Sequence, residues 1–180
     1  RYKRQIKMGL IDPRRTPIPR EPGLKSWSSL PADKRKAEAH LMEIYAAMLD
    51  RVDQNIGRVL KKLQAQKRLD NTVIMFASDN GACAEMPRVK QSGPPGTVTS
   101  YPVVGRGGAT VSDTPLRYWK NYSHEGGICT PFVISWPGHI SKPGTFCRQP
   151  GHFVDVMATA CELAGAAYPD ERGGRPIRPL

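Results

Sequence analysis

The run Thr72-Val-Ile-Met-Phe-Ala-Ser78, followed at once by Asp79-Asn80-Gly81, is the stretch that decides the fold. Its apolar and β-branched residues continue without polar alternation over the length of one strand, as in a strand that is buried on both faces. Because parallel sheets are covered on both faces, the run predicts a parallel strand in an α/β domain. Ligands of open α/β sheets bind beyond the carboxyl ends of strands, so a site is expected at Asp79 and Asn80.

Helices are predicted on either side of this run. From residue 37 to about residue 67, apolar side chains recur every three or four positions, as on one face of a long amphipathic helix. These positions are Leu41, Tyr45, Met48, Val52, Ile56, Val59 and Leu63. A last helix is predicted to begin at a cap formed by Asp155 and to end at Gly165.

A second strand is predicted after a long loop. Residues 87–114 are rich in Gly, Pro, Ser and Thr and show no period, which is typical of a long functional or mobile loop. Residues 128–136 are typical of a strand that starts at Pro131, where proline is tolerated. Helix, strand, loop, strand and helix in this order predict the α/β class. Since two strands make an unstable sheet, we expect this chain to carry part of a larger one.

The amino-terminal segment is strongly basic. Residues 1–36 hold eleven Lys or Arg against three acidic residues, which gives +8 of the formal +11. Five prolines add to the irregular character of the segment: Pro13, Pro17, Pro19, Pro22 and Pro31. We therefore expect a basic irregular arm over 1–36 and the main domain over 37–180. No helix-turn-helix, zinc-finger or aromatic RNA-binding pattern accompanies the arm, so nucleic acid is not the expected partner.

Other bulk features exclude several classes of protein. The four cysteines, Cys83, Cys129, Cys147 and Cys161, show no zinc-ligand spacing. No apolar stretch reaches the length of a membrane span, and residues 1–10 lack the apolar core of a signal peptide, so no membrane partner is expected. The first residue is not Met, which fits both a processed protein and a piece of a longer one.

Asp79 and Asn80 are candidate metal ligands. A carboxylate and an amide oxygen are hard ligands suited to Ca²⁺ or Mg²⁺, and Gly81 allows a sharp turn behind them. The alternative is a plain turn, because Asp-Asn-Gly favours turns in any context.

The stretch from Arg117 to Gly127 is a candidate anion site. Lys120 is a point charge able to hold a sulfate or phosphate oxygen, and Gly126 and Gly127 permit close backbone approach. The alternative is a basic loop with structural glycines.

Three segments together resemble the sulfatases, and the arylsulfatases in particular. They are LDNTVIMFASDNGA at 69–82, PLRYWKNYSHEGGICTPFVISWPG at 115–138 and VDVMATACELAG at 154–165. The likeness extends from YAAMLDRVDQNIGRVLKKL at 45–63 to GGRPI at 173–177. It implies an alkaline-phosphatase-like α/β fold with a mixed sheet flanked by helices, hydrolysis of sulfate esters and a bound divalent cation, usually Ca²⁺. It also implies a periplasmic, secreted or lysosomal location.

Functional residues carry over from this resemblance only where the sequence matches. Asp79 and Asn80 stand where the family has two metal ligands, and Lys120 stands where the family has a lysine that contacts the sulfate. His124 occupies a position that often holds Tyr, so no catalytic role is transferred to it. These three residues are therefore the predicted site residues, with Lys120 catalytic.

The family's nucleophile has no counterpart in this sequence. Sulfatases use a formylglycine made from Cys or Ser in a motif resembling Cys-x-Pro-x-Arg, and the nearest match, Cys129-Thr-Pro-Phe-Val133, lacks the Arg. We therefore read Cys129 as a core residue and the chain as the carboxyl-terminal half of a catalytic domain. The expected partners are a sulfate-ester substrate and the missing amino-terminal half, without which the chain should be inactive.

Two other functions compete with this hypothesis. A phosphoryl or phosphonate hydrolase could use the same fold, because fold alone does not select the reaction. A non-catalytic module could instead bind anionic polymers through the basic arm, and its binding would then fall steeply with salt.

Overall fold

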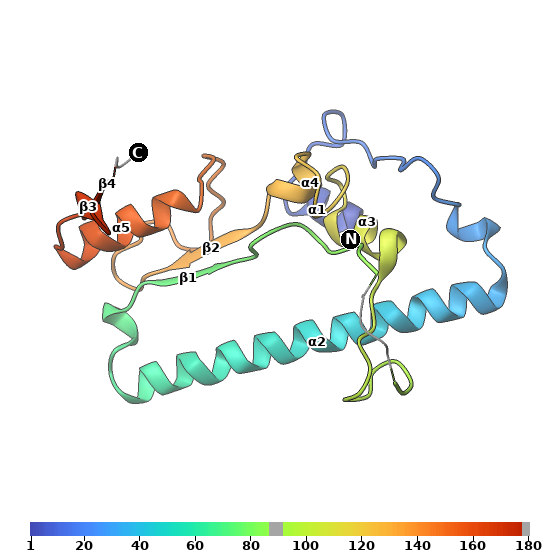
Figure 1. The fold of residues 1–180 in the computed structure, drawn as a ribbon, viewed down its shortest axis with the longest axis horizontal. Helices are drawn as coiled ribbons and strands as arrows, with labels where there is room; N and C mark the ends of the chain where they lie inside the picture. The colour runs from blue at the N-terminus through green and yellow to red at the C-terminus, as the bar shows by residue number, and fades with distance from the viewer. Residues whose placement is uncertain (87–91, 178–180) are drawn as a thin grey trace. The chain divides into compact units, whose positions relative to one another are not determined.

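The computed structural model describes residues 1–86 and 92–177, which form two compact units, Arg1–Pro143 and Gly144–Leu180 (Figure 1). The helices of the first unit are α1 (Tyr2–Lys7), α2 (Ala32–Ala65), α3 (Gly105–Asp113) and α4 (Glu125–Ile128), with short 3₁₀ turns η1 (Trp27–Ser29) and η2 (Leu69–Asn71). Its strands are β1 (Ile74–Ala77) and β2 (Phe132–Ser135). The second unit contains α5 (Val154–Ala164), β3 (Glu171–Arg172) and β4 (Arg175–Pro176). No helix of the described residues is long and apolar enough to cross a membrane.

The long helix predicted from residue 37 is present, but it begins at Ala32. Pro31 stands directly before it and Asp33 lies in its first turn, where a carboxylate favours the helix amino terminus. Periodicity missed this start because the first turns carry charged residues rather than an apolar stripe. Every residue of α2 is described, and none is buried.

The strands β1 and β2 pair antiparallel, with Ile74 opposite Ser135 and Ala77 opposite Phe132. Figure 1 shows the two lying side by side. The predicted parallel direction is therefore wrong for this pair. An uninterrupted apolar run indicates that a strand needs cover on both faces, but it carries no information on the direction of its neighbour, and mixed sheets are common.

Burial of β1 on both faces is also not observed. Phe76 is 47% exposed, and all four residues of β2 are exposed. Within residues 1–86 and 92–177 this sheet consists of two strands, and part of its apolar side-chain surface is in contact with water.

The basic arm is less irregular than predicted, because it starts with helix α1. The Tyr2 hydroxyl donates to the Thr16 carbonyl at 2.6 Å, and the Gln5 amide donates to the Thr114 carbonyl at 3.1 Å. The first hydrogen bond folds the arm back on itself, and the second joins it to the residue that follows α3. Residues 8–26, all of which the structure describes, form no helix or strand.

Helix α3 lies within the region predicted as loop, of which residues 87–91 are outside the described part of the chain. Its sequence GRGGATVSD lacks an apolar period, so periodicity gave no signal. The helix instead uses small residues for close packing: a Cβ at Gly108 would lie 2.9 Å from the Met42 sulfur, and Ala109 is fully buried.

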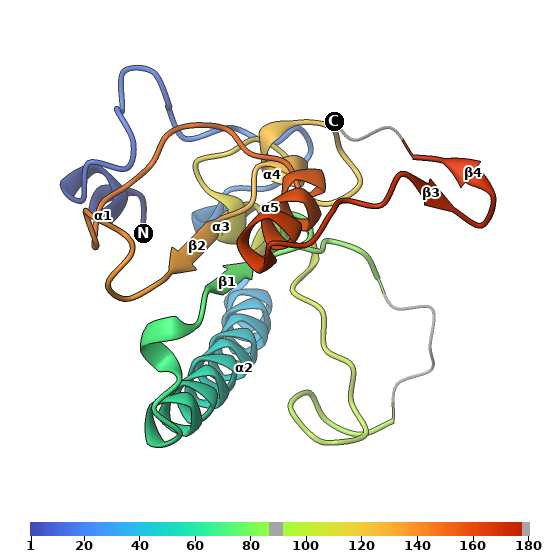
Figure 2. The same cartoon turned by 90° about the vertical axis from the view of Figure 1, so that its left-hand side faces the viewer.

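In the second unit, α5 ends as predicted at Gly165, whose φ of 62° is the left-handed conformation that glycine adopts readily. The predicted cap is wrong: the helix begins one residue before Asp155, after Phe153. The Asp155 carboxylate reaches back and accepts a hydrogen bond from the His152 amide at 2.7 Å. Figure 2 shows β3 and β4 as a short hairpin.

Candidate functional site

The candidate site is built where the loop after β1 meets the segment before α4. The Gly81 amide donates to the Gly127 carbonyl, and the Lys120 amide donates to the Ala82 carbonyl, both at 3.0 Å. The Asp113 carboxylate at the end of α3 accepts the Ala82 amide through both oxygens, at 3.0 and 3.1 Å. Partial burial raises the pKa of Asp113. Three stretches far apart in sequence are thus joined around Ala82.

Glycines make this close approach possible. A Cβ on Gly81 would lie 1.7 Å from the Gly126 carbonyl oxygen, and one on Gly126 would lie 2.1 Å from the Tyr118 carbonyl oxygen. A Cβ on Gly127 would lie 1.9 Å from the Tyr122 carbonyl oxygen. No side chain fits at these distances, so the glycine pair before β2 has a structural role in holding the site together.

The predicted metal ligands lie directly after β1. Asp79 is exposed, and Asn80 is half-buried with its amide donating to the Gly81 carbonyl at 2.7 Å. The Ser78 hydroxyl donates to the Asn80 carbonyl at 2.8 Å, which tightens the turn. The position beyond the end of a strand is the one that the sequence predicted.

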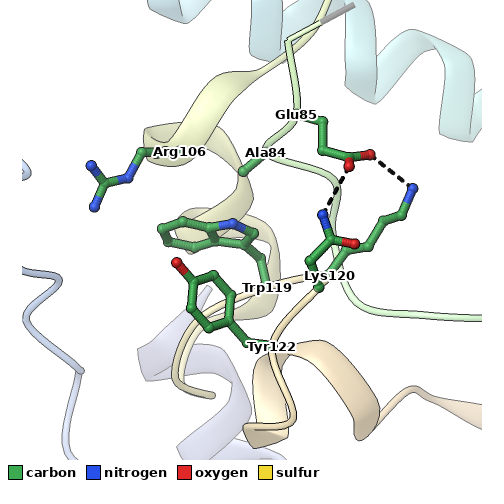
Figure 3. Close-up of a pocket in the computed structure, with 7 residues that line it drawn as sticks. Ala84, Glu85, Arg106, Trp119, Lys120 and Tyr122 are labelled. Atoms are coloured by element: carbon green, nitrogen blue, oxygen red, sulfur yellow. Dashed lines mark hydrogen bonds and ion pairs between the residues drawn. The ribbon is translucent and has the colours of Figure 1, made fainter.

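Lys120 forms an ion pair with a carboxylate that the sequence did not reveal. Its Nζ lies 3.0 Å from Glu85 Oε2, and the Asn121 amide donates to Glu85 Oε1 at 2.8 Å (Figure 3). The hydrogen bond to Glu85 is the main cause that raises the pKa of Lys120, and the charge of Asp79 adds a smaller effect.

The candidate ligands among the described residues could supply only part of the coordination shell of a metal ion. Ca²⁺ takes about six to eight oxygens, and Asp79 and Asn80 supply a carboxylate and an amide of the right chemical type. Among the described residues, no group of three His, Cys, Asp or Glu could hold a metal ion. The pair fits a hard cation as a partial set of ligands.

A groove of about 570 Å³ adjoins the Lys120–Glu85 pair (Figure 3). Its lining consists of Ala84, Glu85, Arg106, Trp119, Lys120, Asn121 and Tyr122. The Trp119 ring is buried, and the Arg106 guanidinium lies 5.4 Å from the centre of that ring. The groove thus combines cations, one carboxylate and aromatic surface, which suits an anionic ligand with an apolar part.

Sequence reasoning missed Glu85, Asn121 and Arg106. Glu85 lies 35 residues from Lys120 in the sequence, and no local sequence pattern predicts a contact between residues so far apart. Asn121 could have been noticed, because an amide beside a predicted anion-binding lysine is a natural second donor.

Exposure corrects one further prediction, and ring contacts describe another predicted position. Cys129 is exposed, so reading it as a core residue was wrong. The strand that would have buried it begins only at Phe132. His124 precedes α4, and its ring packs edge-on to Tyr118 with 4.5 Å between the ring centres.

Comparison with the sequences of known proteins assigns this chain to a family. The sequence model of the Sulfatase family matches residues 18–166. The chain is 34% identical to an uncharacterized sulfatase of Schizosaccharomyces pombe, over 96% of the chain and 34% of that protein. It is 33% identical to an arylsulfatase of Klebsiella aerogenes, over 92% of the chain and 38% of that protein. A steryl-sulfatase of Mus musculus is 32% identical over 83% of the chain and 22% of that protein.

The chain spans about a third of the length of the first two relatives. The matched region includes the turn after β1, the groove and the glycine pair before β2. The chain therefore belongs to the sulfatase family, whose fold is alkaline-phosphatase-like.

Proposed function

We propose that this chain is the carboxyl-terminal half of the catalytic domain of a sulfuric ester hydrolase of the arylsulfatase type. Lys120 binds the sulfate group, and Asp79 and Asn80 contribute to a divalent cation site, for which Ca²⁺ is the expected ion. The nucleophile, a formylglycine, comes from residues outside these 180. The uncovered β1 and β2 and the length of the relatives support this division.

The observation that supports the proposal is the position of the Lys120 ammonium, which lines the groove on a segment joined by a backbone hydrogen bond to the loop after β1. Asp79 lies in that loop three residues before Ala82, whose carbonyl accepts the Lys120 backbone amide at 3.0 Å. An ammonium there donates to a non-bridging sulfate oxygen and stabilises the charge that develops as the ester bond breaks. A cation held by Asp79 and Asn80 would polarise the same sulfate group.

Replacement of Lys120 tests the proposal in the longer protein that contains this chain. Lys120→Ala should lower kcat/KM for an aryl sulfate by a factor on the order of a hundred or more, because a charge aimed at the transferring group is lost. Lys61→Ala, which removes a cation from the exposed face of α2, is the matched control and should keep full activity. An unchanged rate in Lys120→Ala would remove Lys120 from the mechanism.

The same assay separates sulfatase from phosphatase activity. An aryl phosphate of matched leaving group should be hydrolysed far more slowly than the sulfate. A preference for the phosphate would replace the proposed reaction with phosphoryl transfer.

A further inference from the structure

Both oxygens of the Glu85 carboxylate are bound by neighbouring residues. Oε2 lies 3.0 Å from Lys120 Nζ, and Oε1 accepts the Asn121 amide at 2.8 Å. The Cys83 thiol adds a weaker contact at 3.5 Å. Figure 3 shows a dashed line that joins the Glu85 carboxylate to the Lys120 ammonium.

The backbone at Asn121 brings the two donors together. Its φ is 77°, in the left-handed region that Asn adopts more readily than most side chains. The sharp turn lets the consecutive side chains of Lys120 and Asn121 reach one carboxylate. An ammonium and a primary amide side by side form a donor pair for any planar or tetrahedral oxyanion.

The Glu85 carboxylate lies at the groove, where a ligand could take its place on the two donors. The side chains of Lys120 and Glu85 are 35% and 51% exposed, and both line the groove. Exposed ion pairs contribute little net stability, so a competing anion can open this one without large cost. A sulfate group offers the donors the same kind of oxygen that they already bind.

We infer that Glu85 is a built-in competitor of the substrate: its carboxylate occupies the Lys120–Asn121 donor pair until the sulfate group displaces it. Asn121 then becomes a second donor to the sulfate. This inference rests on the proposed function for the role of Lys120 and adds two residues to it. Glu85 sets how tightly the site binds anions, and Asn121 binds the sulfate directly.

A purely positioning role for Glu85 predicts the opposite result. If Glu85 only held Lys120 in place, its removal would weaken anion binding. If Glu85 competes, its removal strengthens binding, since the donors are left open. The sign of the change therefore decides between the two roles.

The test is a titration of the intact protein with sodium sulfate at constant ionic strength, followed by the backbone amide NMR signals of residues 119–122, which every variant retains. Glu85→Gln should lower the Kd for sulfate about two- to five-fold, the change that loss of an exposed ion pair produces. Glu38→Gln is the matched control, because Glu38 also pairs with a lysine, Lys34, at 3.3 Å on helix α2. Its Kd should stay at the wild-type value. Asn121→Ala should raise the Kd.

A Kd for sulfate that rises or stays unchanged in Glu85→Gln overturns the inference. A decrease of the Kd in Glu38→Gln as large as that in Glu85→Gln also overturns it. Glu85→Ala provides a second variant that cannot hydrogen-bond to Lys120, and it should also tighten binding. Loss of turnover in Lys120→Ala together with unchanged sulfate affinity in Glu85→Gln would overturn this inference alone. Absence of hydrolysis by the longer protein that contains this chain, together with tightened sulfate binding in Glu85→Gln, would instead contradict only the proposed reaction.

Discussion

At the scale of single residues, Glu85 shows how neighbouring donors change a carboxylate. Its pKa is lowered from 4.5 to about 2, first by the Asn121 amide and then by Lys120 and Cys83. These groups favour the charged form, so the carboxylate stays ionised where an ordinary Glu is half protonated. The stabilisation that this contact gives is present above pH 4.5, the unfolded value, and is lost as the pH falls through about 2.

Removal of the largest of these donors should raise the pKa of Glu85 toward 4.5. We expect the side-chain carboxyl carbon of Glu85 to keep its ionised NMR shift at pH 4 in the wild type, and to titrate at a higher pH in Asn121→Ala than in the wild type. The measurement is a pH titration of both proteins between pH 7 and the acid limit of folding. A wild-type midpoint near 4.5 would show that the contacts of Glu85 do not persist in solution.

At the scale of elements, the site depends on backbone contact between two segments rather than on apolar packing. The loop after β1 and the segment before α4 are joined by hydrogen bonds of 3.0 Å and by glycines with no space for a side chain. The helix α2, by contrast, contains Gly57 with nothing within 4 Å of a built Cβ. Gly57 therefore has space for a methyl group, whereas Gly81 has none.

Gly81→Ala should lower the free energy of unfolding by at least about 1–3 kcal/mol, because the new methyl overlaps the Gly126 carbonyl and the segments must separate. Gly57→Ala should raise it by roughly 0.5–1 kcal/mol, since alanine favours the interior of a helix. Urea denaturation of both variants measures the difference. Equal effects of the two substitutions would contradict the described junction.

The elements that depend on local pattern could be predicted from the sequence, and those that depend on distant contacts could not. The apolar stripe of α2, the run of β1 and the glycine that ends α5 are each visible within a few residues. Helix α3 is formed by small residues that pack closely, and this packing leaves no period in the sequence. The antiparallel direction of β1 and β2 depends on how more than fifty intervening residues return the chain.

The candidate site divides in the same way. The turn of Asp79 and Asn80 after an apolar run is a local signal, and the structure places it beyond the end of β1 as expected. The carboxylate on Lys120 comes from Glu85, which lies in a different loop. Only the folded structure shows that Lys120, the residue predicted to bind sulfate, already forms an ion pair with a carboxylate.

At the scale of the whole molecule, apolar surface remains open to water. All four residues of β2 and Phe76 of β1 are exposed, and α2 exposes Met48, Leu49, Val52 and Val59. The relatives that the chain matches are about three times as long. Under the proposed function, the remaining part of the domain covers these surfaces and supplies the formylglycine.

The central claim is that these 180 residues supply sulfate and cation ligands but no nucleophile. The most direct measurement is hydrolysis of an aryl sulfate by the purified chain, with and without Ca²⁺. We expect no turnover above the uncatalysed rate in either condition, because none of the four cysteines has the Pro and Arg that formylglycine formation requires. Turnover that survives repurification and disappears in Asp79→Ala would contradict the claim and show that the chain is itself a complete enzyme.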